Sequence, residues 1–119
     1  MKTEYGKIQP YTSKDGSTIR ELMHPIAHGN TEQSLAEAIV PVGSSTLLHR
    51  HLQTEEIYHI TEGSGLMILG DDKFEVTVGD SICIPPGTSH QIRNTGTVNL
   101  KILCCCAPPY SHDDTELLT

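Results

Sequence analysis

Long apolar runs are missing from this chain of 119 residues. No stretch is long enough to span a bilayer, and the first residues, MKTEYGKIQPYTSKDG, lack the apolar run of a secretory signal. We therefore expect no membrane association and a cytoplasmic location. At this length, the chain should form one domain with a single core.

Basic residues are also scarce, since 8 Lys and Arg stand against 15 Asp and Glu. Nucleic-acid binding needs a basic stripe that neutralises phosphates, so this balance argues against a nucleic-acid partner. An anionic ligand would have to be held by a metal ion or by local donors, because the overall field repels it.

The four cysteines form neither a C-x-x-C pair nor a disulfide framework. Cys83 stands alone, and Cys104, Cys105 and Cys106 are consecutive. Neighbours along a strand point to opposite faces, so a disulfide within the run would be strained. We expect reduced, apolar side chains in a sheltered strand, which fits a reducing cytoplasm. A reactive thiol is the weaker alternative, because no feature marks out one of the three.

A long helical period is absent as well. Short strand-like segments follow one another, separated by turns rich in Gly, Pro, Asn and Asp. Such a pattern predicts an all-β, antiparallel sandwich or barrel. A helix is the rival interpretation of NTEQSLAEAIV (30–40), but Pro41 and Gly43 follow at once, so we favour a strand there. The predicted strands are 18–23, 34–40, 45–51, 56–61, 65–70, 73–78, 81–84, 89–93 and 98–106.

The flanks divide the chain into three parts. Residues 1–17 are expected to form an N-terminal arm, 18–107 the β-barrel and 108–119 a short tail. In the tail, Ser111 and Asp114 predict one helical turn against the outside of the barrel. Strands such as GLMILG (65–70) are apolar on both faces, although a small barrel needs only its interior filled. These additional apolar side chains predict that the N-terminal arm or a second subunit covers one face of the sheet. We therefore expect a homodimer.

Most of the candidate metal-binding and catalytic residues lie in one segment, GSSTLLHRHLQTEEIYHITEG (43–63). Residues two apart on a strand share a face, so His49 and His51 should point inward together with Leu47. Glu56 opens the next strand, and Tyr58 shares its face. A single inward histidine is usually a packing residue, but two beside a carboxylate are costly to bury unless paired or bound to metal.

A second segment, GDSICIPPGTSHQIRN (79–94), adds His90 as a third imidazole. Together the two segments resemble the two motifs of the cupin superfamily, in particular its small single-domain microbial members. The matching positions are Gly43, His49, His51, Glu56 and Gly63 in the first motif, and Gly79, Pro85, Gly87, His90 and Asn94 in the second.

This resemblance implies an antiparallel double-sheet jelly-roll (cupin) barrel. It also implies that His49, His51, Glu56 and His90 bind one divalent transition metal ion, Mn, Fe, Ni, Co, Cu or Zn. Glu55 is the alternative ligand in a shifted frame, but the spacing to Gly63 favours Glu56. Because side chains alternate between the two faces of a strand, His59 should lie on the outer face. Three other histidines are expected at the surface: His24, His28 and His112.

Three functions follow from such a site. The first is a metal-dependent, dioxygenase-like oxidoreductase acting on a small chelating enol, diketone or aromatic substrate, with Glu56 as ligand and proton acceptor. The second is a sugar or keto-acid isomerase, epimerase or lyase, with Tyr58 as a possible acid, although Tyr58 is equally well explained as core filling. The third is a noncatalytic module for a small ligand or metal. A pocket wall of Leu47, Ile60 and Ile92 would suit a moderately apolar substrate.

Overall fold

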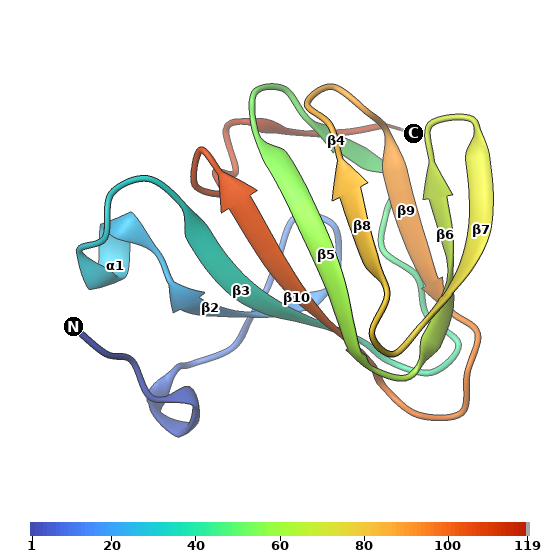
Figure 1. The fold of residues 1–119 in the computed structure, drawn as a ribbon, viewed down its shortest axis with the longest axis horizontal. Helices are drawn as coiled ribbons and strands as arrows, with labels where there is room; N and C mark the ends of the chain where they lie inside the picture. The colour runs from blue at the N-terminus through green and yellow to red at the C-terminus, as the bar shows by residue number, and fades with distance from the viewer. Residues whose placement is uncertain (119) are drawn as a thin grey trace.

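The computed structural model describes residues 1–118 and consists almost entirely of strands (Figure 1). Two short helical turns lie near the N-terminus. The elements in chain order are η1 (Tyr5–Lys7), β1 (Tyr11–Thr12), β2 (Thr18–Met23), α1 (Pro25–His28), β3 (Ser34–Val40), β4 (His49–His51), β5 (Glu55–Glu62), β6 (Ser64–Leu69), β7 (Asp72–Thr77), β8 (Ser81–Ile84), β9 (His90–Asn94), β10 (Leu100–Ala107) and β11 (Thr115–Leu117).

The strands form two antiparallel sheets that face each other as a jelly roll. One sheet has the order β1-β2-β3-β10-β5-β8, and the other has the order β11-β4-β9-β6-β7. The predicted double-sheet architecture is therefore confirmed, but the two sheets do not close into a true barrel.

Alternation along the strands builds the core. In β3 every second residue from Ser34 to Val40 is buried, which confirms the strand over the helical alternative for this segment. The side chains excluded most completely from solvent include Ile60, Met67, Ile84, Ile92, Leu100 and Ile102.

Two motif residues have a clear structural role. Gly63 joins β5 to β6 with φ of +83°, and a Cβ there would lie 2.7 Å from the carbonyl oxygen of Asn99, so only glycine fits. Asn94 donates from Nδ2 to the carbonyls of Val40 and Val98, and its Oδ1 accepts from the Gly96 N–H. These bonds join three segments that come together at one end of the two sheets.

Both flanks take part in the sheets. The N-terminal segment supplies β1, which pairs with β2, and the turn between them spans residues 13–17. The segment from Ser111 to Asp114 forms a hydrogen-bonded turn in which Ser111 Oγ accepts from the Asp113 N–H, although it is not a helix. Strand β11 follows this turn and pairs with β4 through Thr115 opposite His51 and Leu117 opposite His49.

His24 also departs from expectation, because it is buried rather than exposed. Its Nε2 donates to the carbonyl of Tyr110 at 2.8 Å, and its Nδ1 accepts from the N–H of Ile26 at the start of α1. It therefore fixes the N-terminal end of α1 to the segment that precedes β11.

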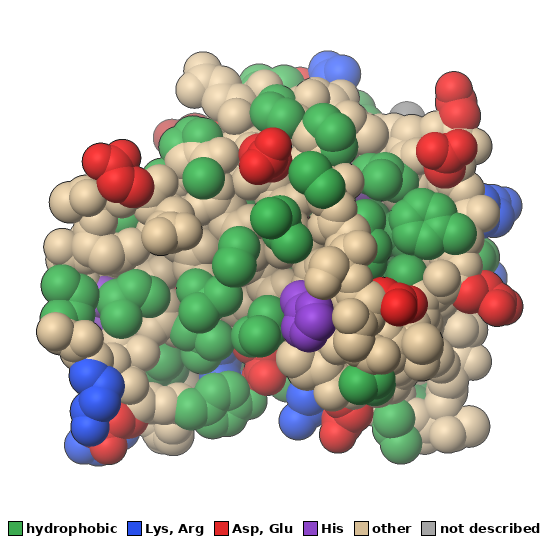
Figure 2. Space-filling model, viewed as in Figure 1, with side chains coloured by type: hydrophobic (Ala, Val, Ile, Leu, Met, Phe, Trp, Pro, Cys, Tyr) green, Lys and Arg blue, Asp and Glu red, His purple; other side chains and the backbone are tan. Residues whose placement is uncertain are grey.

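An apolar row crosses the outer face of the larger sheet. Strand register places Leu35, Cys105, Ile57 and Cys83 next to one another on β3, β10, β5 and β8. Figure 2 shows hydrophobic side chains across the middle of this face. None of the helices within residues 1–118 has the length and hydropathy needed to cross a membrane.

Candidate metal centre

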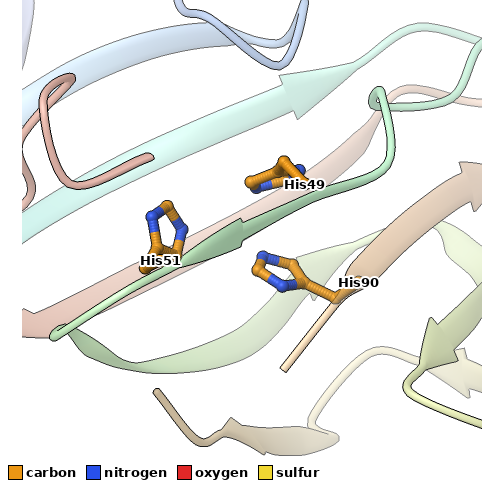
Figure 3. Close-up of side chains that lie close together, drawn as sticks. All are labelled: His49, His51 and His90. Carbon is orange, nitrogen blue, oxygen red and sulfur yellow. The ribbon is translucent and has the colours of Figure 1, made fainter. Parts of the chain in front are cut away.

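Three histidines meet between the sheets. His49 and His51 lie on β4, and His90 begins β9, where strand register places it directly opposite His49. One ring nitrogen of each histidine lies within 4.8 Å of the others, and all three residues are buried. Figure 3 shows the rings gathered around the space between the two strands. The three side chains predicted as nitrogen ligands are thus close enough together to bind a metal ion.

Backbone carbonyls fix two of the rings. His49 Nδ1 lies 2.7 Å from the carbonyl oxygen of Leu47, and His90 Nδ1 lies 3.0 Å from that of Thr88. A carbonyl oxygen only accepts, so each Nδ1 carries the proton and donates. The Nε2 atom of each neutral ring is then left with a free lone pair, which is the form that binds metals.

The third ring is oriented by a residue that the sequence analysis did not single out. His51 Nδ1 lies 2.9 Å from Thr115 Oγ1, and this hydroxyl donates its own proton to the carbonyl of Ser111 at 2.9 Å. Thr115 therefore accepts from His51, so His51 has the same tautomer as the other two. No motif spacing marks Thr115, because it reaches the site through the pairing of β11 with β4.

Glu56 lies beside two of the histidines. Its Oε1 is 3.1 Å from His51 Nε2 and 3.7 Å from His90 Nε2, and its Oε2 accepts a hydrogen bond from the thiol of Cys106 at 3.4 Å. The side chain is buried, whereas Glu55 on the same strand is exposed. Of the two glutamates, Glu56 is therefore the one that faces the histidine cluster.

The donor set fits a cation. His90 is fully buried, and its Nε2 has no hydrogen-bond partner among the described residues. Burial, followed by the influence of His49, lowers the pKa of His90 to about 4, so the ring is neutral at ordinary pH. Lone pairs of three imidazoles and a carboxylate oxygen thus face one another, and such acceptors are stable together only around a positive charge.

Asp15 joins this cluster from the N-terminal segment. Its Oδ2 is 3.5 Å from His49 Nε2, and the carboxyl group is mostly buried. Burial raises the pKa of Asp15, but the electrostatic influence of the nearby His49 and hydrogen bonds from Ser13 and Ser17 outweigh it, so the net shift is downward. Residues 1–17 are expected from the sequence to form an arm, and that segment has no periodicity that predicts this contact.

A pocket opens beside the histidines, toward β2, β3 and β10. Tyr58 lines it and is buried, with the pKa of its phenol raised mainly by burial and further by Glu56. The polar side chains on its wall include Ser13, Asp15, Ser17, Glu21, Ser34, Thr46, Glu56, Tyr110 and Thr115. Of the residues described, those that line it include neither Lys nor Arg.

The expected apolar wall of Leu47, Ile60 and Ile92 is wrong. Ile60 and Ile92 are packed in the core and are not among the described residues that line the pocket, and Leu47 is about half exposed. Leu47 was expected to share the inward face of His49, but β4 begins only at His49, so the alternation does not extend back to it. The apolar part of the wall is formed instead by Ile19, Ala36, Ala38 and Ile102, with Cys104 and Cys106.

The remaining histidines lie elsewhere. His59 points to the outer face of β5, where its Nδ1 contacts the hydroxyl of Ser81 at 2.8 Å, as period two predicted. His112 is exposed. The four cysteines are free thiols, with Cys104 and Cys106 buried and Cys83 and Cys105 exposed.

Comparison with known proteins assigns this fold and its motifs to a protein family. The cupin domain family model matches residues 36–106, which include both motifs. An uncharacterized protein of Methanocaldococcus jannaschii, MJ1618, is 65% identical over 118 residues, covering 99% of this chain and 94% of the relative. The oxalate-binding protein of Thermotoga maritima is 34% identical over 84 residues, covering 71% of this chain and 65% of that protein.

Solved structures agree with this placement. A Thermotoga maritima protein described as a predicted oxalate decarboxylase has a TM-score of 0.77 at 28% identity, covering 91% of this chain and 99% of its own. The polyketide cyclase RemF of Streptomyces resistomycificus has a TM-score of 0.83 at 22% identity, covering 100% and 85%, and it shows the fold alone. From the family match and the two motifs around the histidine cluster, we conclude that this chain belongs to the cupin family.

Proposed function

We propose that the protein is a metal-dependent enzyme that acts on a small, oxygen-bearing molecule. His49, His51, His90 and Glu56 would hold one divalent ion, Mn, Fe, Ni, Co, Cu or Zn. The observation that carries the proposal is the convergence of three imidazoles, two of them fixed by backbone carbonyls so that Nε2 faces inward, beside the Glu56 carboxylate. Such a set is typical of catalytic metal sites.

A bound ion would polarise an oxygen of the substrate and stabilise negative charge that develops there. The surrounding side chains would then manage protons. Glu56 and Asp15 are carboxylates at the edge of the cluster, and the Tyr58 phenol keeps its proton because burial raises its pKa. A carboxylate oxygen would take a proton from the carbon next to a carbonyl and return it to the neighbouring carbon. Tyr58 would donate its proton to the carbonyl oxygen and take one back from the adjacent hydroxyl, which becomes the new carbonyl.

These proton carriers favour an isomerase, epimerase or lyase acting on a sugar or keto-acid. The pocket wall supports this choice. Ser13, Ser17, Ser34 and Thr46 offer hydroxyls to a polar ligand, and the carboxylates of Asp15 and Glu21 would accept from its hydroxyl groups. Since neither Lys nor Arg is among the described residues of the wall, a neutral substrate suits it better than a multiply charged anion.

A metal-dependent oxygenase, the first expectation from the sequence, is the second candidate. Four protein ligands on an octahedral ion leave two positions, enough for a chelating enol, diketone or aromatic substrate or for substrate and O2 together. A noncatalytic binding module would use the same pocket without turnover. For either enzyme, we further propose a cytoplasmic homodimer that covers the apolar row of Leu35, Cys105, Ile57 and Cys83.

The test begins with elemental analysis of untagged protein purified without chelators or imidazole. Near-stoichiometric transition metal supports the proposal, and reconstitution with each ion in turn corrects for wrong loading by an expression host. Hydroxy-carbonyl compounds and enols are then incubated with each metal form, with and without O2. Turnover without O2 favours proton transfer, O2 consumption favours the oxygenase, and failure to bind any added metal overturns both.

A further inference from the structure

We infer that Asp15 is a fifth protein ligand of the metal ion, so that the centre contains two carboxylates rather than one. This inference rests on the proposed function, since it concerns the same ion. It assigns a chemical role to the turn between β1 and β2, which lies outside both cupin motifs.

The two oxygens of Asp15 have separate partners. Oδ1 accepts hydrogen bonds from the Ser13 hydroxyl, the Ser17 N–H at 3.0 Å and the Ser17 hydroxyl at 2.6 Å. Oδ2 faces His49 Nε2 at 3.5 Å. The turn thus uses one oxygen to fix the carboxylate and directs the other into the histidine cluster.

The atom that Oδ2 faces is itself an acceptor. Because His49 Nδ1 donates to the Leu47 carbonyl, the Nε2 atom of the neutral ring bears a lone pair. A carboxylate oxygen and an imidazole lone pair repel each other unless a cation lies between them. The contact of Asp15 with His49 therefore repeats the arrangement of Glu56 with His51 on the other side of the cluster.

The distances agree with ligands on adjacent positions of one ion. Ligand atoms about 2.1 Å from a metal and at right angles to each other lie about 3 Å apart. The Asp15–His49 separation of 3.5 Å falls between the 3.1 Å and 3.7 Å separations of Glu56 from His51 and His90. Metal binding would have to draw both carboxylates inward, because the described group whose ligand atoms all lie within 4.8 Å of one another consists of the three histidines.

Hydrogen bonds fix the turn between β1 and β2 to the segments next to His49 and His51. The Asp15 carbonyl accepts from the Leu47 N–H at 2.8 Å, two residues before His49. Lys14 Nζ donates to the Thr115 carbonyl at 2.7 Å, and Thr115 orients His51. Ser13 N–H closes the turn on the Ser17 carbonyl at 2.9 Å. Asp15 is therefore fixed to the segments that carry two of the histidines, as a ligand requires.

A second carboxylate changes what the centre can bind. Two carboxylates and three neutral imidazoles balance the charge of a divalent ion, so the loaded site has no excess positive charge for a dianion. Five protein ligands on an octahedral ion leave one open position. A substrate would then bind through a single oxygen, and its other polar groups would meet Glu21 and the serine hydroxyls of the wall.

The experiment is a titration of metal-free protein with Co²⁺, followed by calorimetry and by the visible absorption of the bound ion. The variants are Asp15→Asn, Asp15→Ala and Asp71→Ala, which removes an exposed carboxylate of the β6–β7 turn as a charge control. Asp15→Asn keeps an acceptor for Ser13 and Ser17. Melting temperatures of the metal-free forms verify that each variant is folded.

We expect both Asp15 variants to bind Co²⁺ about tenfold or more weakly than the wild type, with an altered visible spectrum, and Asp71→Ala to match the wild type. Unchanged affinity and spectrum in folded Asp15 variants would overturn the inference and leave the proposed function standing. Weaker binding with an unchanged spectrum would also overturn it, because Asp15 would then act without ligating the ion. A wild type that binds no Co²⁺ and no other transition metal would overturn both.

Discussion

His51 donates from Nδ1 to the hydroxyl of Thr115 at 2.9 Å, across the pairing of β4 with β11. This bond fixes the ring so that Nε2 points to Glu56. It joins a motif residue to a strand that lies outside both motifs, and its contribution can be measured directly.

Thr115→Val should weaken metal binding by about 10- to 100-fold, because it removes the acceptor that orients His51. Calorimetric titration with Zn²⁺ measures the effect. Thr115→Ser keeps the hydroxyl and should bind nearly as well as the wild type. Equal losses in both variants would point to packing of the threonine methyl group instead of the hydrogen bond.

Glu56→Ala should sharply reduce the metal content of the purified protein, whereas Glu55→Ala should barely change it. The two side chains are neighbours on β5, but Glu56 is buried beside His51 and His90 and Glu55 is exposed. Elemental analysis of the two variants, prepared in parallel, gives the comparison. The reverse result would show that the ligand frame is shifted by one residue.

Removing the metal should leave the protein folded. Its core of Ile60, Met67, Ile84, Ile92 and Leu100 is buried without help from the site. Denaturant unfolding of the metal-free form should remain cooperative, and added metal should raise the midpoint in proportion to its affinity. Non-cooperative unfolding of the metal-free form would mean that the ion is structural.

Tyrosine ionisation should occur at unusually high pH. Burial raises the pKa of Tyr110 to about 12, and burial with the Glu21 hydrogen bond raises that of Tyr11 further. The unfolded chain loses these protons near its ordinary tyrosine pKa of about 10. The folded state therefore holds more protons than the unfolded state above about pH 10, so stability should fall as the pH rises from there toward 12 and beyond.

Phenolate absorbance in the near ultraviolet measures this effect. Folded protein should show little phenolate at pH 10, and the absorbance should rise steeply when alkaline unfolding begins. Tyr110→Phe should remove part of that rise. Normal titration of all the tyrosines in protein that is still folded would contradict the buried environment of Tyr11 and Tyr110.

Regular strands explain why so much of the site could be predicted. The two-residue alternation of strand side chains correctly assigned His49, His51 and Glu56 to the interior and His59 to the outer face, because β4 and β5 are unbroken over those residues. The spacing of the second motif then identified His90 as the third imidazole of the site. Leu47 was assigned wrongly because the strand does not extend back to it.

Asp15 and Thr115 could not be predicted in the same way. Asp15 depends on the conformation of a five-residue turn, and Thr115 on which strand the C-terminal segment pairs with. Neither leaves a period or a spacing in the sequence. The inward strand faces predicted an apolar pocket with few charges, but the turn brings Asp15 into it, and Glu21 lies on β2 with its side chain on the pocket wall.

The centre draws on residues as far apart in the chain as Asp15, His90 and Thr115. Closing such long loops is slow, since the entropy of the intervening chain must be lost before the contacts form. The cluster should therefore be one of the last parts of the molecule to assemble during refolding. A metal ion added to the denatured chain would meet no finished site, so it should slow the unfolding rate and leave the refolding rate almost unchanged.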